Sequence, residues 1–291
     1  MSNNLLTIST PDASGTTIGP QIEPGITAKI DGQEFHLGYS RIASYLACPK
    51  QYKFTYMDKV PYKGSSAMRK GQAYHGTVEA LLQHKMDTGE KMLLKQADRM
   101  AVNIGKKEKL TPNEIYKLID GVRYYHEHMY DLHDPVGIED SFSIVRGGVT
   151  LTGRIDLYDR KGVIIDHKFS HDIWPEERAK HGVQPMIYQW AGLDVLTEKY
   201  GVPYSGFSYN VARTWPSCMI QVIHIPLIDQ WTSDWWEEQV SLVAQAVRAG
   251  LFPANPGDKA CKWCQHKKVC QPAIYKPWIS IAGPHVDNTF D

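Results

Sequence analysis

The chain has 291 residues, of which 42% are hydrophobic, so it can bury a sizeable core as one large domain or two smaller ones. Its 32 basic and 32 acidic side chains balance, which argues against a protein that coats nucleic acid non-specifically but allows a local basic groove. No run of residues approaches the roughly 20 apolar residues of a membrane helix, and the N-terminus has no secretory signal pattern. We therefore expect a soluble, cytoplasmic protein without a membrane partner.

The first part of the chain combines turn-forming and basic segments. Residues 1–25 are expected to form a flexible tail, and residues 26–37 a small hairpin around an Asp-Gly turn. Ser40 is expected to cap a short helix, and Pro49 to lie in the first turn of the next one. Residues 50–70 hold six basic residues, one acid and four aromatic rings. This mixture suits single-stranded nucleic acid, but core aromatics beside solvated lysines explain it equally well.

A helix is predicted over residues 67–86, and it carries a regularly spaced glycine, histidine and acid. Gly71, His75 and Glu79 follow one another at four-residue steps, so they share one face of the helix. The glycine leaves room for a ligand to approach the imidazole. A lone helical histidine is more often a packed residue than a ligand, so this spacing alone favours a core histidine.

Two more helices and a group of strands follow. The helices are expected over residues 91–105 and 112–132, the second with a capping box and a proline in its first turn. Strands are predicted over residues 140–146, 149–158 and 163–169. The last two are joined by Asp-Arg-Lys-Gly, which is typical of a β-hairpin turn.

This hairpin would bring two carboxylates and a lysine together on a buried strand. Asp156 would lie across from Asp166, and strand alternation would place Asp166 and Lys168 on one face. Burying these charges is costly unless a cation or a reaction requires them. Mg²⁺ binds through one or two carboxylates and phosphate oxygens, and a lysine can orient water and stabilise charge on phosphorus. The pattern indicates metal-assisted phosphodiester hydrolysis; the alternative is a surface hairpin with an ordinary ion pair.

The second half of the chain continues to alternate helices and strands. A helix ending near residue 200 has Pro185 in its first turn, so Gln184 stands at its start and Tyr188 one turn later. Two strands up to residue 225 and an amphipathic helix over residues 231–249 follow. We therefore expect an α/β or α+β fold built around one hairpin-centred sheet, with a helical subdomain. The chain has no G-x-x-x-x-G-K-[ST] loop, so any helicase activity must come from a partner.

Four motifs, in order, resemble those of the RecB-type branch of the PD-(D/E)xK nucleases, and most closely its iron–sulfur members such as AddB-type and CRISPR-associated exonucleases. Each motif is weak alone, but all four stand in the family's order on the expected helix, strand, strand and helix. The resemblance covers Ser40 to Cys270. The motifs are Gly71-x3-His75-x3-Glu79, Gly153-Arg154-Ile155-Asp156, Asp166-His167-Lys168 and Gln184-x3-Tyr188.

The resemblance implies a restriction-endonuclease-like core sheet flanked by helices, in a single nuclease domain over residues 26–275 followed by a tail at 276–291. It implies that Mn²⁺ or Mg²⁺ is bound by His75, Asp156, Asp166 and the backbone carbonyl of His167. It further implies that Lys168 acts on the attacking water, and that Gln184 and Tyr188 help to hold the scissile strand.

The five cysteines are unevenly spread, which indicates a metal or cluster site rather than a disulfide framework. The resemblance implies a [4Fe–4S] cluster held by Cys48, Cys261, Cys264 and Cys270, which would join the two ends of the domain. Such a long-range crosslink should stabilise the fold by at least a few kcal/mol. The alternative is structural zinc bound by the three C-terminal cysteines and His266. Cys218, on a predicted strand, is expected to be a small buried hydrophobe.

The resulting expectation is a metal-dependent DNA nuclease, an exonuclease acting on single-stranded DNA or DNA ends in recombination, repair or CRISPR-type DNA processing, with a possible helicase or recombination partner. Two alternatives stay open. One is a non-catalytic DNA-binding accessory protein on a nuclease fold, which the intact D…D-x-K set disfavours. The other is a zinc-braced RNA-processing nuclease.

Overall fold

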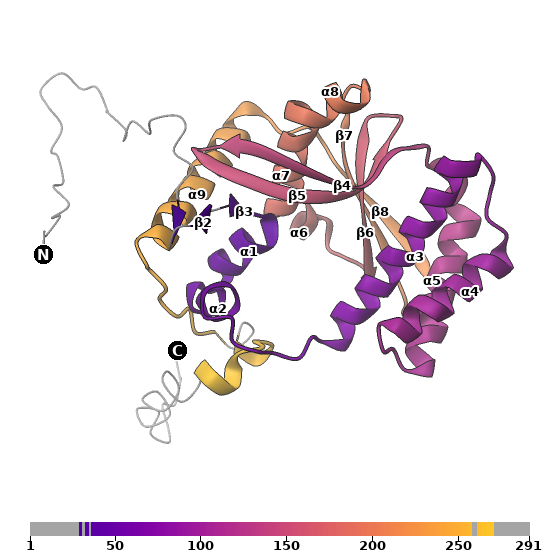
Figure 1. Cartoon of the computed structure of the whole chain (residues 1–291), viewed down its shortest axis with the longest axis horizontal. Coiled ribbons are helices and arrows are strands. Elements are labelled where there is room, and N and C mark those ends of the chain that lie inside the picture. Colours follow the sequence, from indigo (N-terminus) through magenta and orange to yellow (C-terminus); the bar gives the residue numbers. More distant parts are fainter. Residues whose placement is uncertain (1–28, 31–32, 35, 258–260, 271–291) are drawn as a thin grey trace, which may run out of the picture.

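The computed structural model describes residues 29–30, 33–34, 36–257 and 261–270 (Figure 1). The tails expected at residues 1–25 and 276–291 lie outside the described residues. Of the expected small hairpin, strands β1 (Lys29–Ile30) and β2 (Gln33–Glu34) are described and pair antiparallel. In the described part of the chain, no helix combines the length and apolar character that crossing a bilayer requires.

A six-stranded mixed sheet forms the centre of the fold. Strands β4, β5 and β6 are antiparallel in sequence order, β7 runs parallel to β6, and β8 is antiparallel to β7. A parallel pair needs a crossover, which is supplied between β6 and β7 by helices α6 (Glu176–Lys180), α7 (Val183–Ala191) and α8 (Thr197–Tyr200). The strands are β3 (His36–Leu37), β4 (Pro135–Arg146), β5 (Val149–Asp159), β6 (Val163–Ser170), β7 (Gly206–Arg213) and β8 (Met219–Ile225).

Strand β6 is the central strand, as its run of β-branched residues predicts. It pairs with β5 through Leu157–Ile165 and Tyr158–Ile164, so the predicted hairpin is confirmed. Ile164 and Ile165 are both buried but belong to two different hydrophobic clusters, one on each face of the sheet. A strand covered on both faces reads as a continuous apolar run rather than an alternating one.

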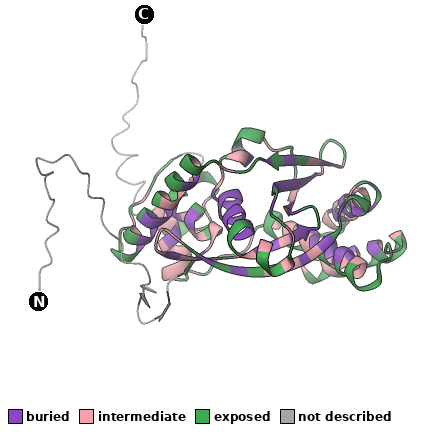
Figure 2. Cartoon of the chain, turned by 90° about the horizontal axis from the view of Figure 1, so that it is seen from above, coloured by how far each residue is buried: buried purple, intermediate pink, exposed green. Residues whose placement is uncertain are grey.

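Helices cover both faces of the sheet (Figure 1). On one face α3 (Ser66–Thr88), α4 (Leu94–Lys107) and α5 (Pro112–His128) pack together, and a short 3-10 turn (Tyr130–Leu132) follows them. On the other face lie α1 (Tyr39–Ala47), α7 and α9 (Gln230–Arg248). Buried residues follow the sheet and the inner helix faces, whereas the outer helix faces are exposed (Figure 2).

Helix boundaries differ from the sequence-based expectation at several places. The helix expected to reach residue 132 ends at His128, and the helix that begins at Pro49 continues as a π-helix over Lys53–Met57. Helix α1 begins at Tyr39 with Gly38 as its N-cap, so Ser40 lies inside the first turn and is not the cap. The helix expected to reach residue 200 is interrupted by a π-turn at Gly192–Leu196. Gly192 lies directly against the ring of Tyr204, and a Cβ atom there would overlap that ring. The tertiary contact thus decides a local geometry that the helical periodicity does not encode.

Candidate active site

Three acidic side chains stand in a row on neighbouring strands. The register of β4 against β5 places Glu139 opposite Asp156. The register of β5 against β6, continued by one pair, places Asp166 beside Asp156, as the hairpin predicts. Opposed side chains on adjacent strands are about 5 Å apart at Cβ, so Asp156 lies close to both Glu139 and Asp166.

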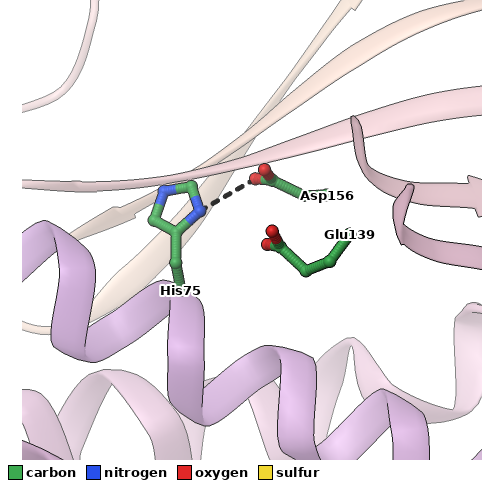
Figure 3. A group of neighbouring side chains, drawn as sticks. All are labelled: His75, Glu139 and Asp156. Atoms are coloured by element: carbon green, nitrogen blue, oxygen red, sulfur yellow. Dashed lines mark ion pairs between the residues drawn. The ribbon is translucent and has the colours of Figure 1, made fainter. Parts of the chain in front are cut away.

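Helix α3 brings His75 to this row of carboxylates. The Nδ1 atom of His75 lies 3.0 Å from the Oδ2 atom of Asp156. The same Asp156 oxygen accepts a hydrogen bond of 2.7 Å from the backbone N–H of His167. His75, Glu139 and Asp156 each offer one ligand atom, and these atoms all lie within 4.8 Å of one another (Figure 3). Carboxylate oxygens with one imidazole are a donor set that suits a divalent cation.

The third carboxylate, Asp166, has its own partners. The Nζ atom of Lys168 lies 2.5 Å from Oδ2 of Asp166, and the side-chain amide of Gln184 donates to the other oxygen. Tyr209 in turn donates a hydrogen bond of 3.4 Å to the amide oxygen of Gln184. Gln184, at the start of α7 as predicted, therefore fixes the orientation of Asp166.

Tyr188 packs beneath the same site. Its hydroxyl donates a hydrogen bond of 2.8 Å to the backbone carbonyl of Arg154, two residues before Asp156. Its ring meets those of Tyr39 and Phe142 edge to face. The Tyr188 hydroxyl thus holds β5 in position from below.

The two central aspartates have different electrostatic environments. Burial would raise the pKa of Asp156, but the His75 imidazole and the Lys168 ammonium outweigh burial and lower its pKa to about 2. Burial and the nearby charge of Asp156 raise the pKa of Asp166 to about 6. The Lys168 ammonium offsets only part of this increase. Two carboxylates with separated pKa values in one cleft are typical of a functional site rather than of ordinary packing.

The remaining groups follow the same logic. Burial raises the pKa of Glu139 to about 7, and the charge of Asp156 adds to this shift. Burial would lower the pKa of His75, but Asp156 raises it above its usual value. Burial would likewise lower the pKa of Lys168, but the charge of Asp166 outweighs burial and raises it. Lys168 therefore stays protonated. The carboxylates of Glu139 and Asp156 lie together beside His75, where a cation would stabilise their negative charge.

These side chains open into a cleft of about 640 Å³ between helix α3 and the sheet. A Cβ atom added at Gly71 would meet no atom within 4 Å, so the space that the sequence predicts beside His75 is present. The lining includes Gly38, Tyr39, Gly71, His75, Glu79, Glu139, Gly153, Arg154, Asp156, Asp166, Lys168 and Tyr188.

Sequence reasoning missed Glu139 at this site. The β4 strand was expected to begin at residue 140, whereas it begins at Pro135 and carries Glu139 opposite Asp156. Glu139 has a left-handed backbone conformation with φ of 48°, which is unusual inside a strand, and its neighbours Gly137 and Asp140 have low β-propensity, so the sequence does not indicate a strand here. The available signal was the Gly147-Gly148 turn: a two-residue turn pairs Arg146 with Val149, and counting back along this register reaches Glu139 across from Asp156.

The aromatic residues of segment 50–70 serve mainly as packing. Tyr52 is buried and stacks on Phe252, and Phe54 and Tyr62 contact the imidazole of His266. These contacts favour the core interpretation for the rings, while the lysines of the segment stay at the surface or half-buried. Of the four rings only Tyr62 is exposed, at 43%, so the rings do not together form an exposed base-stacking platform.

The same segment lies against the C-terminal cysteines. The backbone N–H of Asn255 lies 3.5 Å from Sγ of Cys48, and the Lys50 N–H donates to Pro253. Cys264 and Cys270 lie close enough to Cys48 and Cys261 for those two thiols to raise their pKa values, after burial, which has the larger effect. The thiols from the two ends of the domain therefore influence one another electrostatically, but among the described residues no three cysteine sulfur atoms lie within 4.8 Å of one another. The four thiols are Cys48, Cys261, Cys264 and Cys270.

The two other residues considered with these cysteines have different surroundings. His266 is buried, and its Nε2 atom lies 2.9 Å from the hydroxyl of Thr55. Cys218 is half-buried just before β8 rather than on a strand, and burial raises its pKa to about 11.

Comparison with known proteins decides the family of this fold and site. A family model described as the PD-(D/E)XK nuclease superfamily matches residues 36–271. The chain belongs to the PD-(D/E)XK nuclease superfamily. Nucleases of this superfamily use divalent metals, and the sheet flanked by helices is consistent with a restriction-endonuclease-like core. The conclusion that the protein is a nuclease follows from this membership.

One solved structure agrees with the fold. A provisionally named exonuclease from Eubacterium rectale is similar with a TM-score of 0.53 at 11% identity, over 81% of this chain and 88% of that one. The protein SSO0001 has a TM-score of 0.34 at 15% identity, over 79% of this chain and 96% of that one. The search of curated proteins finds no match.

Proposed function

We propose that this PD-(D/E)XK nuclease is a metal-dependent DNA exonuclease that acts on single-stranded DNA or DNA ends. The observation that carries the proposal is the convergence of His75, Asp156, Asp166 and Lys168 on one cleft from α3, β5 and β6. A decayed, purely DNA-binding relative would have no need to keep a buried lysine paired with a buried aspartate, because such a pair is costly to bury.

The cation would be held by His75, Asp156, Asp166 and the backbone carbonyl of His167. A divalent cation supplies charge that polarises the scissile phosphodiester and lowers the pKa of a bound water. The chain prepares its residues for this: the His167 N–H and His75 orient Asp156, and Gln184 orients Asp166. Oriented ligands reduce the reorganisation that cation binding would otherwise require.

Lys168 serves as a positively charged hydrogen-bond donor beside the attacking water. Because Asp166 raises the pKa of Lys168, its ammonium donates hydrogen bonds at neutral pH and does not act as a base. It therefore orients the water and stabilises the negative charge that develops on the phosphate. Gln184 and Tyr188 would help to hold the scissile DNA strand indirectly. Gln184 orients Asp166, and Tyr188 fixes the backbone of Arg154.

For these four cysteines we propose an iron–sulfur cluster rather than zinc. A [4Fe–4S] cluster takes four thiolates, and Cys48 supplies the one that the three C-terminal cysteines lack. The competing zinc site needs His266, whose Nε2 atom is instead within hydrogen-bonding distance of Thr55. The cluster would tie residues 45–57 to residues 251–270, which already meet through Tyr45 and Leu251.

The proposed setting is the cytoplasm, in recombination, repair or CRISPR-type DNA processing, with a helicase or recombination protein as partner. Exposed lysines of the segment that connects α2 (Pro49–Tyr52) to α3 would guide the DNA backbone. These include Lys59 and Lys63.

The test is to purify the protein without oxygen and digest end-labelled single-stranded DNA, double-stranded DNA and RNA with Mg²⁺ or Mn²⁺. Stepwise loss of the labelled end from DNA, abolished by EDTA, is expected. Cation-dependent DNA binding without cleavage would instead establish the accessory-protein alternative. Preferential cleavage of RNA by a zinc-containing, colourless protein would establish the RNA-processing alternative.

A further inference from the structure

Arg154 reaches the cleft but is bound to one of its carboxylates. Its Nε atom lies 2.7 Å from an oxygen of Glu139, and the side chains are 65% and 15% exposed, respectively. The backbone of Arg154 is fixed by the hydrogen bond from Tyr188. Arg154 therefore has a rigid base and a solvent-facing guanidinium with one acidic partner.

Glu139 has a stronger partner available when a cation enters. Its carboxylate lies within 4.8 Å of ligand atoms of His75 and Asp156, so Glu139 can join these two proposed ligands as a further ligand of the same ion (Figure 3). Because the Arg154 side chain is 65% exposed, water screens its ion pair with Glu139 and weakens it. A divalent ion held by two carboxylates and an imidazole competes easily with such a pair.

We propose that cation binding takes Glu139 away from Arg154 and so releases Arg154 to contact a DNA phosphate. The inference rests on the proposed nuclease function and adds a coupling between its two ligands. The planar guanidinium can donate two parallel hydrogen bonds to a phosphate, whereas a lysine offers only a point charge. By linkage, DNA must then raise the affinity for the cation by the same factor as the cation raises the affinity for DNA.

The other permanent cation of the cleft cannot play this part. Among the described residues that line the cleft, only Arg154 and Lys168 carry a permanent positive charge. Lys168 is 19% exposed and paired with Asp166, which is itself 2% exposed. Arg154 is thus the cleft residue whose availability to phosphate depends on what Glu139 binds.

The experiment measures binding of a fluorescent single-stranded oligonucleotide by anisotropy, in EDTA and in Ca²⁺, over a range of salt concentrations. Gels confirm that the oligonucleotide stays intact. In Ca²⁺, Arg154→Gln should bind roughly fivefold or more weakly than the wild type. The slope of log affinity against log salt should be shallower by about one, the value for one lost phosphate contact. In EDTA the two proteins should agree in affinity and slope.

A second pair of variants separates release of Arg154 from simple removal of negative charge. Glu139→Gln should bind DNA more tightly than the wild type in EDTA, and Arg154→Gln added to it should cancel that gain. Glu79→Gln removes the same charge from the cleft lining without freeing Arg154. Adding Arg154→Gln to this variant should therefore leave its DNA affinity in EDTA unchanged.

Equal losses for Arg154→Gln in EDTA and in Ca²⁺ would make Arg154 a constant contact and overturn the inference. No loss in either condition would overturn it as well. The nuclease proposal is decided separately, by cleavage of labelled DNA with Mn²⁺, so the two can fail independently.

Discussion

The imidazole of His75 and the carboxylate of Asp156 form a 3.0 Å pair that joins helix α3 to strand β5. Without a cation, the charge of Asp156 outweighs burial, raises the pKa of His75 and so favours the protonated imidazole. A metal ion would bind the neutral imidazole and replace that proton as the counter-charge. The pair therefore links the acid–base state of the cleft to the choice of metal.

His75→Ala should weaken cleavage in Mn²⁺ more than in Mg²⁺. Carboxylate ligands suit Mg²⁺, whereas an added imidazole shifts the preference toward Mn²⁺. The wild type is expected to cleave faster in Mn²⁺ than in Mg²⁺ at equal concentration, and the variant should narrow this gap. Rates are measured in metal titrations of both proteins. An unchanged Mn²⁺ curve for the variant would make His75 a packing residue.

Lys168→Ala should reduce cleavage by at least about a hundredfold, the lower end for a positioned donor or acid–base group. DNA binding should survive, because phosphate contacts are spread over many residues. Single-turnover rates and anisotropy measure the two effects. Lys161→Ala, at the hairpin turn, is the matched control and should cleave normally. A near wild-type rate for Lys168→Ala would remove Lys168 from the mechanism.

The protein purified without oxygen should be brown, with broad absorbance near about 400 nm. Cys261→Ser and Cys48→Ser should each bleach this colour and lower the free energy of unfolding, because the cluster would lose a ligand. Cys218→Ser, outside the group of four, should keep the colour. A colourless wild type with one zinc per chain would contradict the cluster, and full colour in Cys48→Ser would contradict the long-range link.

A buried histidine away from the cleft should make stability depend on pH. His133 is 5% exposed, and its Nδ1 atom lies 2.7 Å from the Tyr125 hydroxyl. Burial lowers the pKa of His133 to about 4, against about 6.5 in an unfolded chain. Between these values the unfolded state binds more protons, so this group's contribution to stability falls as the pH drops from about 6.5 to 4 and then levels off.

The variant His133→Gln tests this dependence. The difference in unfolding free energy between wild type and variant should change by up to about 3 kcal/mol across that window, the value of 2.5 pKa units. Urea unfolding at several pH values between 4 and 7.5 measures it. Parallel curves for the two proteins would show that His133 is not held neutral by burial.

The sequence by itself determined the hairpin, the central strand and the order of the elements. The apolar run of β6 and the Asp-Arg-Lys-Gly turn before it predict the β5–β6 hairpin. Strand alternation then places Asp166 and Lys168 on one face. The four-residue steps of α3 fix Gly71 and His75 on one face in the same way. These are local rules of backbone geometry, and they need no knowledge of distant contacts.

Only the tertiary structure decided which partners these residues meet. Helical spacing does not say which strand His75 faces. The sequence pattern also did not predict that Glu139, whose backbone is left-handed, lies on a strand. The Glu139–Arg154 pair depends on the β4–β5 register together with side-chain directions. The reason is physical: periodicity records which side of an element is buried, whereas the identity of the neighbour is set by packing between segments far apart in the chain.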